Sequence, residues 1–144
     1  MDKISVSAGL KRIQVNDNGD FITFDARDQG FADRFGELLK SFNQKKDEYD
    51  KKVKEIQSMP NETREQQAFI VLAALEFNSD LCAWMAEQVN AVFQDDVKAK
   101  VFGNITPTGE AWAEFLYQLA PIVYKAKAEQ SEKVRQYTDK YKKG

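Results

Sequence analysis

The hydrophobic pattern of this chain changes its period once, near residue 27, and this change limits the possible folds more than any other feature. Before it, the stretch KRIQVNDNGDFITFDA (11–26) holds two runs of alternating apolar and polar residues around Asn18-Gly19. Asn-Gly favours the two-residue type I′ turn of a β-hairpin, because both residues tolerate positive φ. The preceding ISVSA (4–8) also alternates, so the sheet has either two or three antiparallel strands. Apolar residues are predicted to share a face within each strand: Ile13 with Val15, and Ile22 with Phe24.

From residue 28 onward the apolar residues recur at spacings of three and four, which predicts helices. Asp28 is a candidate N-cap, and Met59-Pro60-Asn61 is expected to end the first helix. Opposite charges recur at i, i+3 and i+4 in its second half, NQKKDEYDKKVKEI (43–56), so we expect this half to project as one arm of a helical hairpin. The predicted apolar stripe of this helix consists of Phe31, Phe35, Leu38, Phe42, Tyr49, Val53 and Ile56.

A second helix is predicted to begin with the capping box formed by Thr63 and Gln66. We expect its first turns to point Phe69, Leu72 and Leu75 inward. Asn78-Ser79-Asp80 either interrupts this helix or bends it, and the pattern leaves both alternatives open. The following segment places a strong apolar face on one side, made of Leu81, Trp84, Met85, Val89, Val92 and Phe93.

The stretch KVFGNITPTGEAWAEF (100–115) is rich in Gly, Thr and Pro, and its composition raises the question of a ligand-binding loop. A phosphate-binding loop needs a preceding strand and a following Lys, and this stretch has neither. Gly103 instead fits the end of a short helix, DDVKAKVF (95–102). The last helix then starts at Thr106-Pro107 or at Thr108. Its apolar face is predicted to contain Trp112, Phe115, Leu116, Leu119, Ile122 and Val123.

Several classes of chemistry lack their usual residues. The chain contains no histidine and one cysteine, Cys82, which lies between apolar residues and is expected to be buried. Asp95 and Asp96 are better explained as helix caps than as metal ligands, because adjacent side chains on a helix diverge by about 100°. We therefore expect no catalytic residues, no cofactor and no metal site, and a protein that is not an enzyme.

Charge is distributed unevenly along the chain. Residues 1–60 hold 11 Lys and Arg against 11 Asp and Glu, residues 61–120 hold 3 against 9, and residues 121–144 hold 7 against 3. This layout argues against a broad nucleic-acid-binding face and fits head-to-tail self-association or an acidic partner for the end of the chain. The longest apolar run, 68–75, is far shorter than the roughly 20 residues of a membrane helix, and residues 1–15 contain no apolar signal-peptide core. We expect a cytoplasmic protein without a membrane partner.

The C-terminal stretch YKAKAEQSEKVRQYTDKYKKG (124–144) is the best candidate for a functional segment. It is cationic, and its apolar stripe is too sparse for a core position. It is either a docking strip or a solvated terminal helix. The predicted partner-binding residues are Lys133, Val134, Tyr137, Lys140 and Tyr141.

Together these patterns predict a single domain spanning 1–144, of the α+β class and mostly α. An N-terminal antiparallel β element (1–27) precedes a helical core (28–123) and a long basic C-terminal helix (124–144).

In the order of these features and in its local sequence, the chain resembles the tail assembly chaperone-like proteins of long-tailed phages and prophages of Gram-positive bacteria. The resemblance is carried by LKRIQVNDNGDFITFDARDQGFADRF (10–35), VFGNITPTGEAWAEFLYQLAPIV (101–123) and SEKVRQYTDKYKKG (131–144). It implies a non-enzymatic assembly factor that binds the tape-measure protein and recruits tail-tube subunits in the host cytoplasm. The alternatives are a structural virion component, such as a head–tail connector or tail completion protein, and a small phage-encoded regulatory or anti-defence binder.

Overall fold

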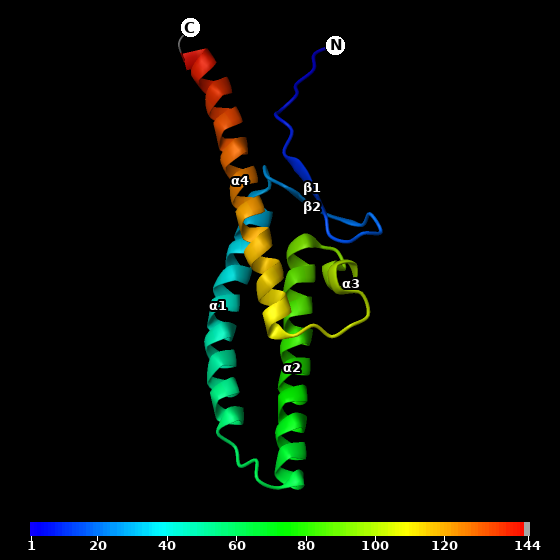
Figure 1. Ribbon diagram of the computed structural model, residues 1–144. Coiled ribbons are helices and arrows are strands. Elements are labelled where there is room, and N and C mark those ends of the chain that lie inside the picture. Colours follow the sequence, from blue (N-terminus) through cyan, green and yellow to red (C-terminus); the bar gives the residue numbers. More distant parts are fainter. Residues whose placement is uncertain (143–144) are drawn as a thin grey trace.

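The computed structural model describes residues 1–142, with side chains described for residues 1–140. It confirms the predicted class, α+β and mostly α, with an antiparallel hairpin followed by helices (Figure 1). The elements in chain order are β1 (Leu10–Gln14), β2 (Phe21–Asp25), α1 (Gln29–Gln57), α2 (Arg64–Phe93), α3 (Val97–Phe102) and α4 (Gly109–Lys142).

The hairpin has the predicted faces and only two strands within residues 1–142. Ile13 pairs with Ile22 across the ladder, and Ile22 and Phe24 are buried in the core. The alternative of a third strand at 4–8 is wrong. Only Gly9 separates those residues from β1, and a reversal into an antiparallel neighbour needs a loop of at least about two residues.

The hairpin connection differs from the predicted type I′ turn. The N–H of Val15 donates to the carbonyl of Asp20 over 3.0 Å, and the N–H of Gly19 donates to the carbonyl of Asn16 over 3.4 Å. The side-chain oxygen of Asn16 accepts hydrogen bonds from the N–H groups of Asn18 and Asp20. Gly19 has a φ of +85° whereas Asn18 has a negative φ, so the type I′ prediction is wrong. The Asn16 side chain stabilises a longer loop that the dipeptide rule does not consider.

Helices α1 and α2 form a long antiparallel pair joined at 58–63 (Figure 1). Asp28 occupies the predicted N-cap of α1, although its side chain makes no capping hydrogen bond. The predicted capping box of Thr63 and Gln66 is present at the start of α2. α2 runs without interruption through residues 78–80, which settles the alternative left open by the sequence. The stripe of α1 is buried in its first half and half-buried at Tyr49, Val53 and Ile56.

The prediction that Phe69, Leu72 and Leu75 point inward is wrong. Their exposed fractions are 62%, 52% and 60%. The half-buried positions in this part of α2 are instead Gln66, Ile70, Ala73 and Phe77, which recur at helical spacing. Residues 68–75 are apolar on every side of the helix, so periodicity cannot orient them.

Helix α4 starts halfway along the α1–α2 pair and packs across its upper half (Figure 1). The hydroxyl of Thr108 accepts a hydrogen bond from the N–H of Ala111 over 3.2 Å, so Thr108 is the correct one of the two predicted starts. Pro107 is a buried loop residue rather than the first residue of the helix. Of the predicted apolar face, Phe115 is only half-buried and Ile122 is 42% exposed; the fully buried members are Trp112, Leu116, Leu119 and Val123.

Gly103 ends α3, as the sequence predicts, with φ 65° and ψ −134°. This conformation is strained for residues that carry a Cβ atom. We expect Gly103→Ala to lower the free energy of unfolding by about 1–3 kcal/mol, measured by urea denaturation. Gly36→Ala in α1 is the control, because its added Cβ meets nothing within 4 Å and should stabilise the helix by about 0.5–1 kcal/mol. A neutral effect of Gly103→Ala would contradict this account of the connection.

Candidate protein-binding surfaces

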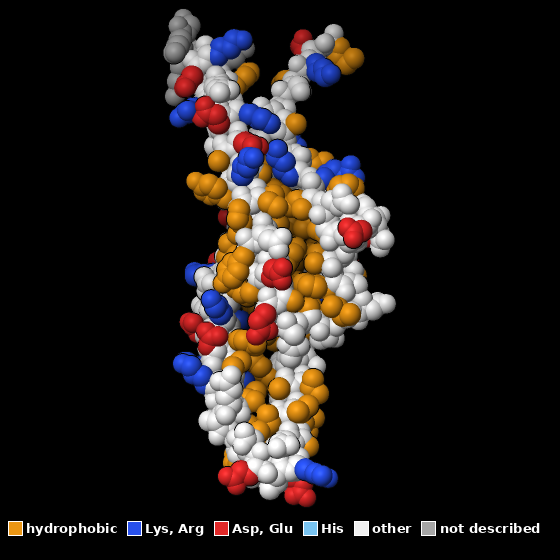
Figure 2. Space-filling view, viewed as in Figure 1, with side chains coloured by type: hydrophobic (Ala, Val, Ile, Leu, Met, Phe, Trp, Pro, Cys, Tyr) orange, Lys and Arg blue, Asp and Glu red, His pale blue; other side chains and the backbone are white. Residues whose placement is uncertain are grey.

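An apolar groove lies between α4, α3 and the hairpin, and we refer to it as the α4 groove. Its volume is about 390 Å³. Figure 2 shows hydrophobic side chains gathered on the surface between these elements. Side chains at its edge include the polar Gln14, Glu114 and Gln118. The apolar lining consists of Ile13, Val15, Val101, Phe102, Ala111, Phe115, Leu119 and Ile122.

Polar contacts from α3 hold the two walls of the α4 groove together. The ammonium group of Lys100 pairs with Asp95 at 2.6 Å and donates to the carbonyl of Phe21 in β2 at 3.0 Å. The amide group of Asn16 donates to the carbonyl of Lys100 at 2.9 Å. These bonds connect α3 to both sides of the hairpin loop, so they position Phe102 against α4.

Trp112, in the first turn of α4, packs behind two aromatic residues that line the α4 groove. Its ring is fully buried and lies edge-on to Phe102, with 4.8 Å between the ring centroids, and it also contacts Phe115. Its indole N–H is buried and has no hydrogen-bond partner among the described residues. Aromatic packing must therefore offset a desolvation cost of about 1–3 kcal/mol.

A second groove runs between the projecting halves of α1 and α2, and we refer to it as the arm groove. Its volume is about 370 Å³. Thr108 and Glu110, where α4 begins, also line it. The apolar lining comes from both helices: Tyr49, Val53 and Ile56 of α1, and Ala74, Leu75 and Phe77 of α2.

Tyr49 joins α1 to the beginning of α4. Its hydroxyl donates to a carboxylate oxygen of Glu110 over 2.5 Å, and its ring stacks on Phe77. This hydrogen bond is the main cause that lowers the pKa of Glu110. Burial, followed by the same hydrogen bond, raises the pKa of Tyr49 to about 12.

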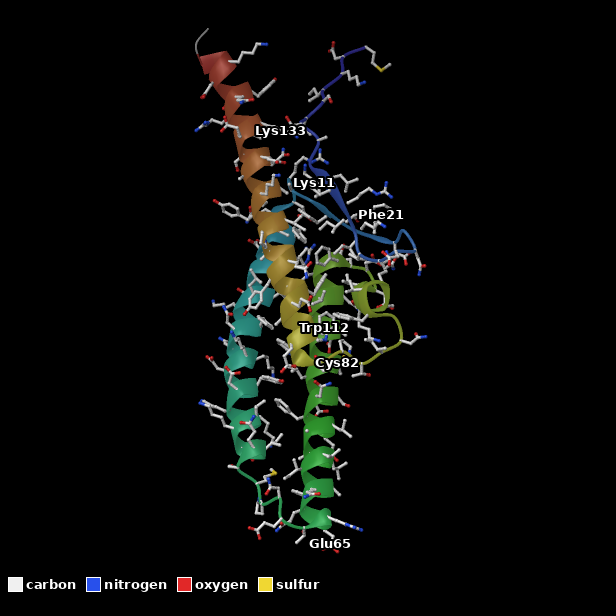
Figure 3. The ribbon with its side chains drawn as sticks, in the orientation of Figure 1. Lys11, Phe21, Glu65, Cys82, Trp112 and Lys133 are labelled. Atoms are coloured by element: carbon white, nitrogen blue, oxygen red, sulfur yellow. The ribbon has the colours of Figure 1, made fainter. Side chains whose placement is uncertain are left out.

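The predicted partner-binding residues lie on the part of α4 that extends beyond the other helices. Figure 3 shows Lys133 there, far from Trp112 and Cys82. Lys133 and Lys140 are exposed, and the exposed fractions of Val134 and Tyr137 are 47% and 62%. The side chain of Tyr141 lies outside the described residues. The structure thus places the four described side chains on one solvent-exposed segment, and their role in binding stays a prediction.

The side chains that could act as metal ligands are dispersed over the described residues. Within 1–142 no group of three or more Cys, Asp and Glu side chains converges as metal ligands do. Cys82 is buried, as predicted, and Asp96 caps α3 by accepting from the N–H of Ala99. By length and composition alone, α2 could cross a membrane, with a mean hydropathy of 1.4 over its most apolar window. A single such helix is weak evidence, because helices of soluble proteins meet the same criterion.

Sequence reasoning found neither groove. Both depend on residues that are distant in the chain, such as Ile13 with Ile122 and Val53 with Leu75. One available signal was the apolar excess at 68–75, which has more apolar residues than a single helix–helix contact can bury.

Comparison of the chain with protein-family models, with curated proteins and with solved structures gave no match.

Replacing Tyr49 by Phe tests the contact between α1 and the start of α4. The pKa of Glu110 is lowered in the folded state, so its contribution is present above the unfolded pKa and is lost as the pH falls through the acid range. We expect Tyr49→Phe to lower the free energy of unfolding by about 1 kcal/mol at pH 7, because the hydrogen bond is partly exposed.

The difference between the two proteins should shrink at pH 3 and in strongly alkaline solution, where Tyr49 itself ionises. Urea unfolding at these pH values and an NMR titration of Glu110 are the measurements. An unchanged pKa of Glu110 in the variant would show that the hydrogen bond is not formed in solution.

Proposed function

We propose that this protein is a non-enzymatic tail assembly chaperone of a long-tailed phage or prophage. It acts in the host cytoplasm and binds the tape-measure protein, the tail-tube protein or both. Two things support the proposal: the resemblance carried by residues 10–35, 101–123 and 131–144, and the α4 groove. The α4 groove is the structural observation that supports a protein-binding function.

The shape and chemistry of the α4 groove suit an amphipathic helix of a client protein. The groove is apolar along its length and is open to solvent (Figure 2). Polar side chains at its edge can accept and donate hydrogen bonds at the boundary of a docked helix. Ile122, an apolar residue that is 42% exposed, would be covered by such a helix.

Weak contacts of this kind fit a chaperone for a long client. One groove of about 390 Å³ covers only a short helical segment. A tape-measure protein that presents many such segments could bind many copies, and multivalency would then supply the total affinity. The resemblance supplies the identity of the client, and the groove supplies a surface on which it could bind.

The test is co-expression with the tape-measure protein of the same phage, followed by affinity purification of the client. Ile122→Glu places a charge inside the α4 groove and should lower client recovery about tenfold or more. Tyr124→Glu is the matched control, because Tyr124 is 77% exposed on the same helix and does not line the groove. Both variants should retain the helical circular dichroism spectrum of the unmodified protein.

Equal client recovery with Ile122→Glu and Tyr124→Glu would remove the α4 groove from client binding. Purified virions give the second readout. A chaperone should be absent from finished particles, whereas a constant number of copies per particle would identify a connector or completion protein. Lack of binding to any tail protein, together with absence from virions, would favour the regulatory or anti-defence class.

A further inference from the structure

The arm groove is a helix position that no segment of the described chain fills. Helix α4 packs on the upper half of the α1–α2 pair and begins at Gly109 (Figure 1). Below this point the pair continues to its tip with the groove between its helices open. Thr108 and Glu110 lie at the end of the groove nearest α4, so the groove continues the path of α4 in the opposite direction.

The apolar stripe of α2 is also left uncovered toward the tip of the arm. Met85 and Val89 are buried where α4 begins its course across the pair. Toward the tip, the same stripe continues at spacings of three and four through Val71 and Leu75, whose exposed fractions are 57% and 60%. One face of α2 is therefore covered along half of its length and uncovered along the other half.

The opposite end of the molecule has the complementary feature, a helix segment in which no described side chain is buried. The last buried residue of α4 is Gln130, and every described side chain from 131 to 140 is exposed. α4 runs past the start of α1 and the end of α2 (Figure 1), and the segment before β1 borders it across an open space of about 670 Å³. We refer to residues 131–142 as the tail helix.

The tail helix is short enough to fit along the open part of α2, and its apolar residues have the spacing that such a contact needs. Twelve residues span about 18 Å, and the part of α2 before its contacts with residues 107–109, residues 64–77, spans about 21 Å. Val134, Tyr137 and Tyr141 recur at spacings of three and four, which is the pattern of a helix that packs between two others.

The charges also match. The end of α4, residues 124–142, has six Lys and Arg against three Asp and Glu, whereas both helices of the arm with their connection, residues 43–81, have six Lys and Arg against eight Asp and Glu. Glu110, at the end of the groove nearest α4, adds a further carboxylate. Basic side chains near the end of an incoming helix would therefore meet acidic ones.

We propose that the arm groove binds the tail helix of a second copy of this chain. In this arrangement the second copy is displaced along the long axis of the molecule. The C-terminal end of α4 in one copy then lies next to the first turn of α4 in the other copy. The added helix completes a three-helix bundle in the arm and covers Leu75. The interface is heterologous, so repetition of the same contact extends into an open chain of copies. This inference does not rest on the proposed client, because the contact involves only this chain.

Sedimentation velocity of the purified protein over a range of concentrations tests the proposal. The unmodified protein should associate as the concentration rises. Leu75→Glu in the groove and Val134→Glu in the tail helix should each weaken association about tenfold or more, because each would place a charge in a dry contact. Leu72→Glu is the control, because Leu72 is 52% exposed on α2 and does not line the groove.

A mixture of the two weakened variants distinguishes this interface from others. The Leu75→Glu variant keeps an intact tail helix, and the Val134→Glu variant keeps an intact groove. Their equimolar mixture should therefore form dimers, although neither variant associates strongly alone, and it should form no longer chains.

Results of three kinds would overturn the proposal. The first is an unmodified protein that remains monomeric up to its solubility limit. The second is a mixture that stays monomeric, or a Leu72→Glu control that is weakened as much as Leu75→Glu. The third is flotation of a monomeric protein with phosphatidylcholine vesicles that Leu75→Glu abolishes, which would assign the exposed face to a lipid surface.

Discussion

The packing of α4 against only half of the α1–α2 pair is the constraint on which the rest of the structure depends. Gly103 ends α3, Thr108 caps α4, and Trp112 is buried one turn later, so α4 must begin at mid-length of α2. Above that point all four helices and the hairpin share one core. Below it two helices remain, and their apolar surface exceeds what they can bury against each other. The position of one helix start thus creates both an open arm and a protruding tail helix.

The two grooves differ in how they are built, and we propose a different kind of contact for each. The α4 groove is walled by α3 and the hairpin, which Lys100 connects through hydrogen bonds, so its shape is held by polar bonds around an apolar floor. The arm groove lies between two helices that are otherwise uncovered. A client on the first groove and a neighbouring copy on the second do not compete for residues. In the chaperone role that we propose, copies held next to each other would bind a long client with greater total affinity.

Much of the fold could be predicted from the sequence, because local patterns specify it. Alternation around residue 18 indicated the hairpin, and the capping box at Thr63 marked the start of α2. The hairpin loop could not be predicted, because the Asn16 side chain competes with the turn preference of Asn-Gly. Helical periodicity assumes that another part of the chain covers each apolar face of a helix. This assumption gave the wrong orientation for Phe69, Leu72 and Leu75, which are exposed. The two grooves were harder to predict from the sequence than the fold, because each groove is formed by residues that are far apart in the chain and share no local pattern.

Disulfide trapping between copies tests the central claim most directly. Val71 and Val134 lie at opposite ends of one molecule but at neighbouring positions in the proposed contact. In a Cys82→Ala background, a protein carrying Val71→Cys and Val134→Cys should form a ladder of covalent oligomers under mild oxidation. A protein carrying Leu72→Cys and Val134→Cys should remain largely monomeric. Equal cross-linking in the two proteins, or none in either, would contradict the insertion of the tail helix into the arm groove.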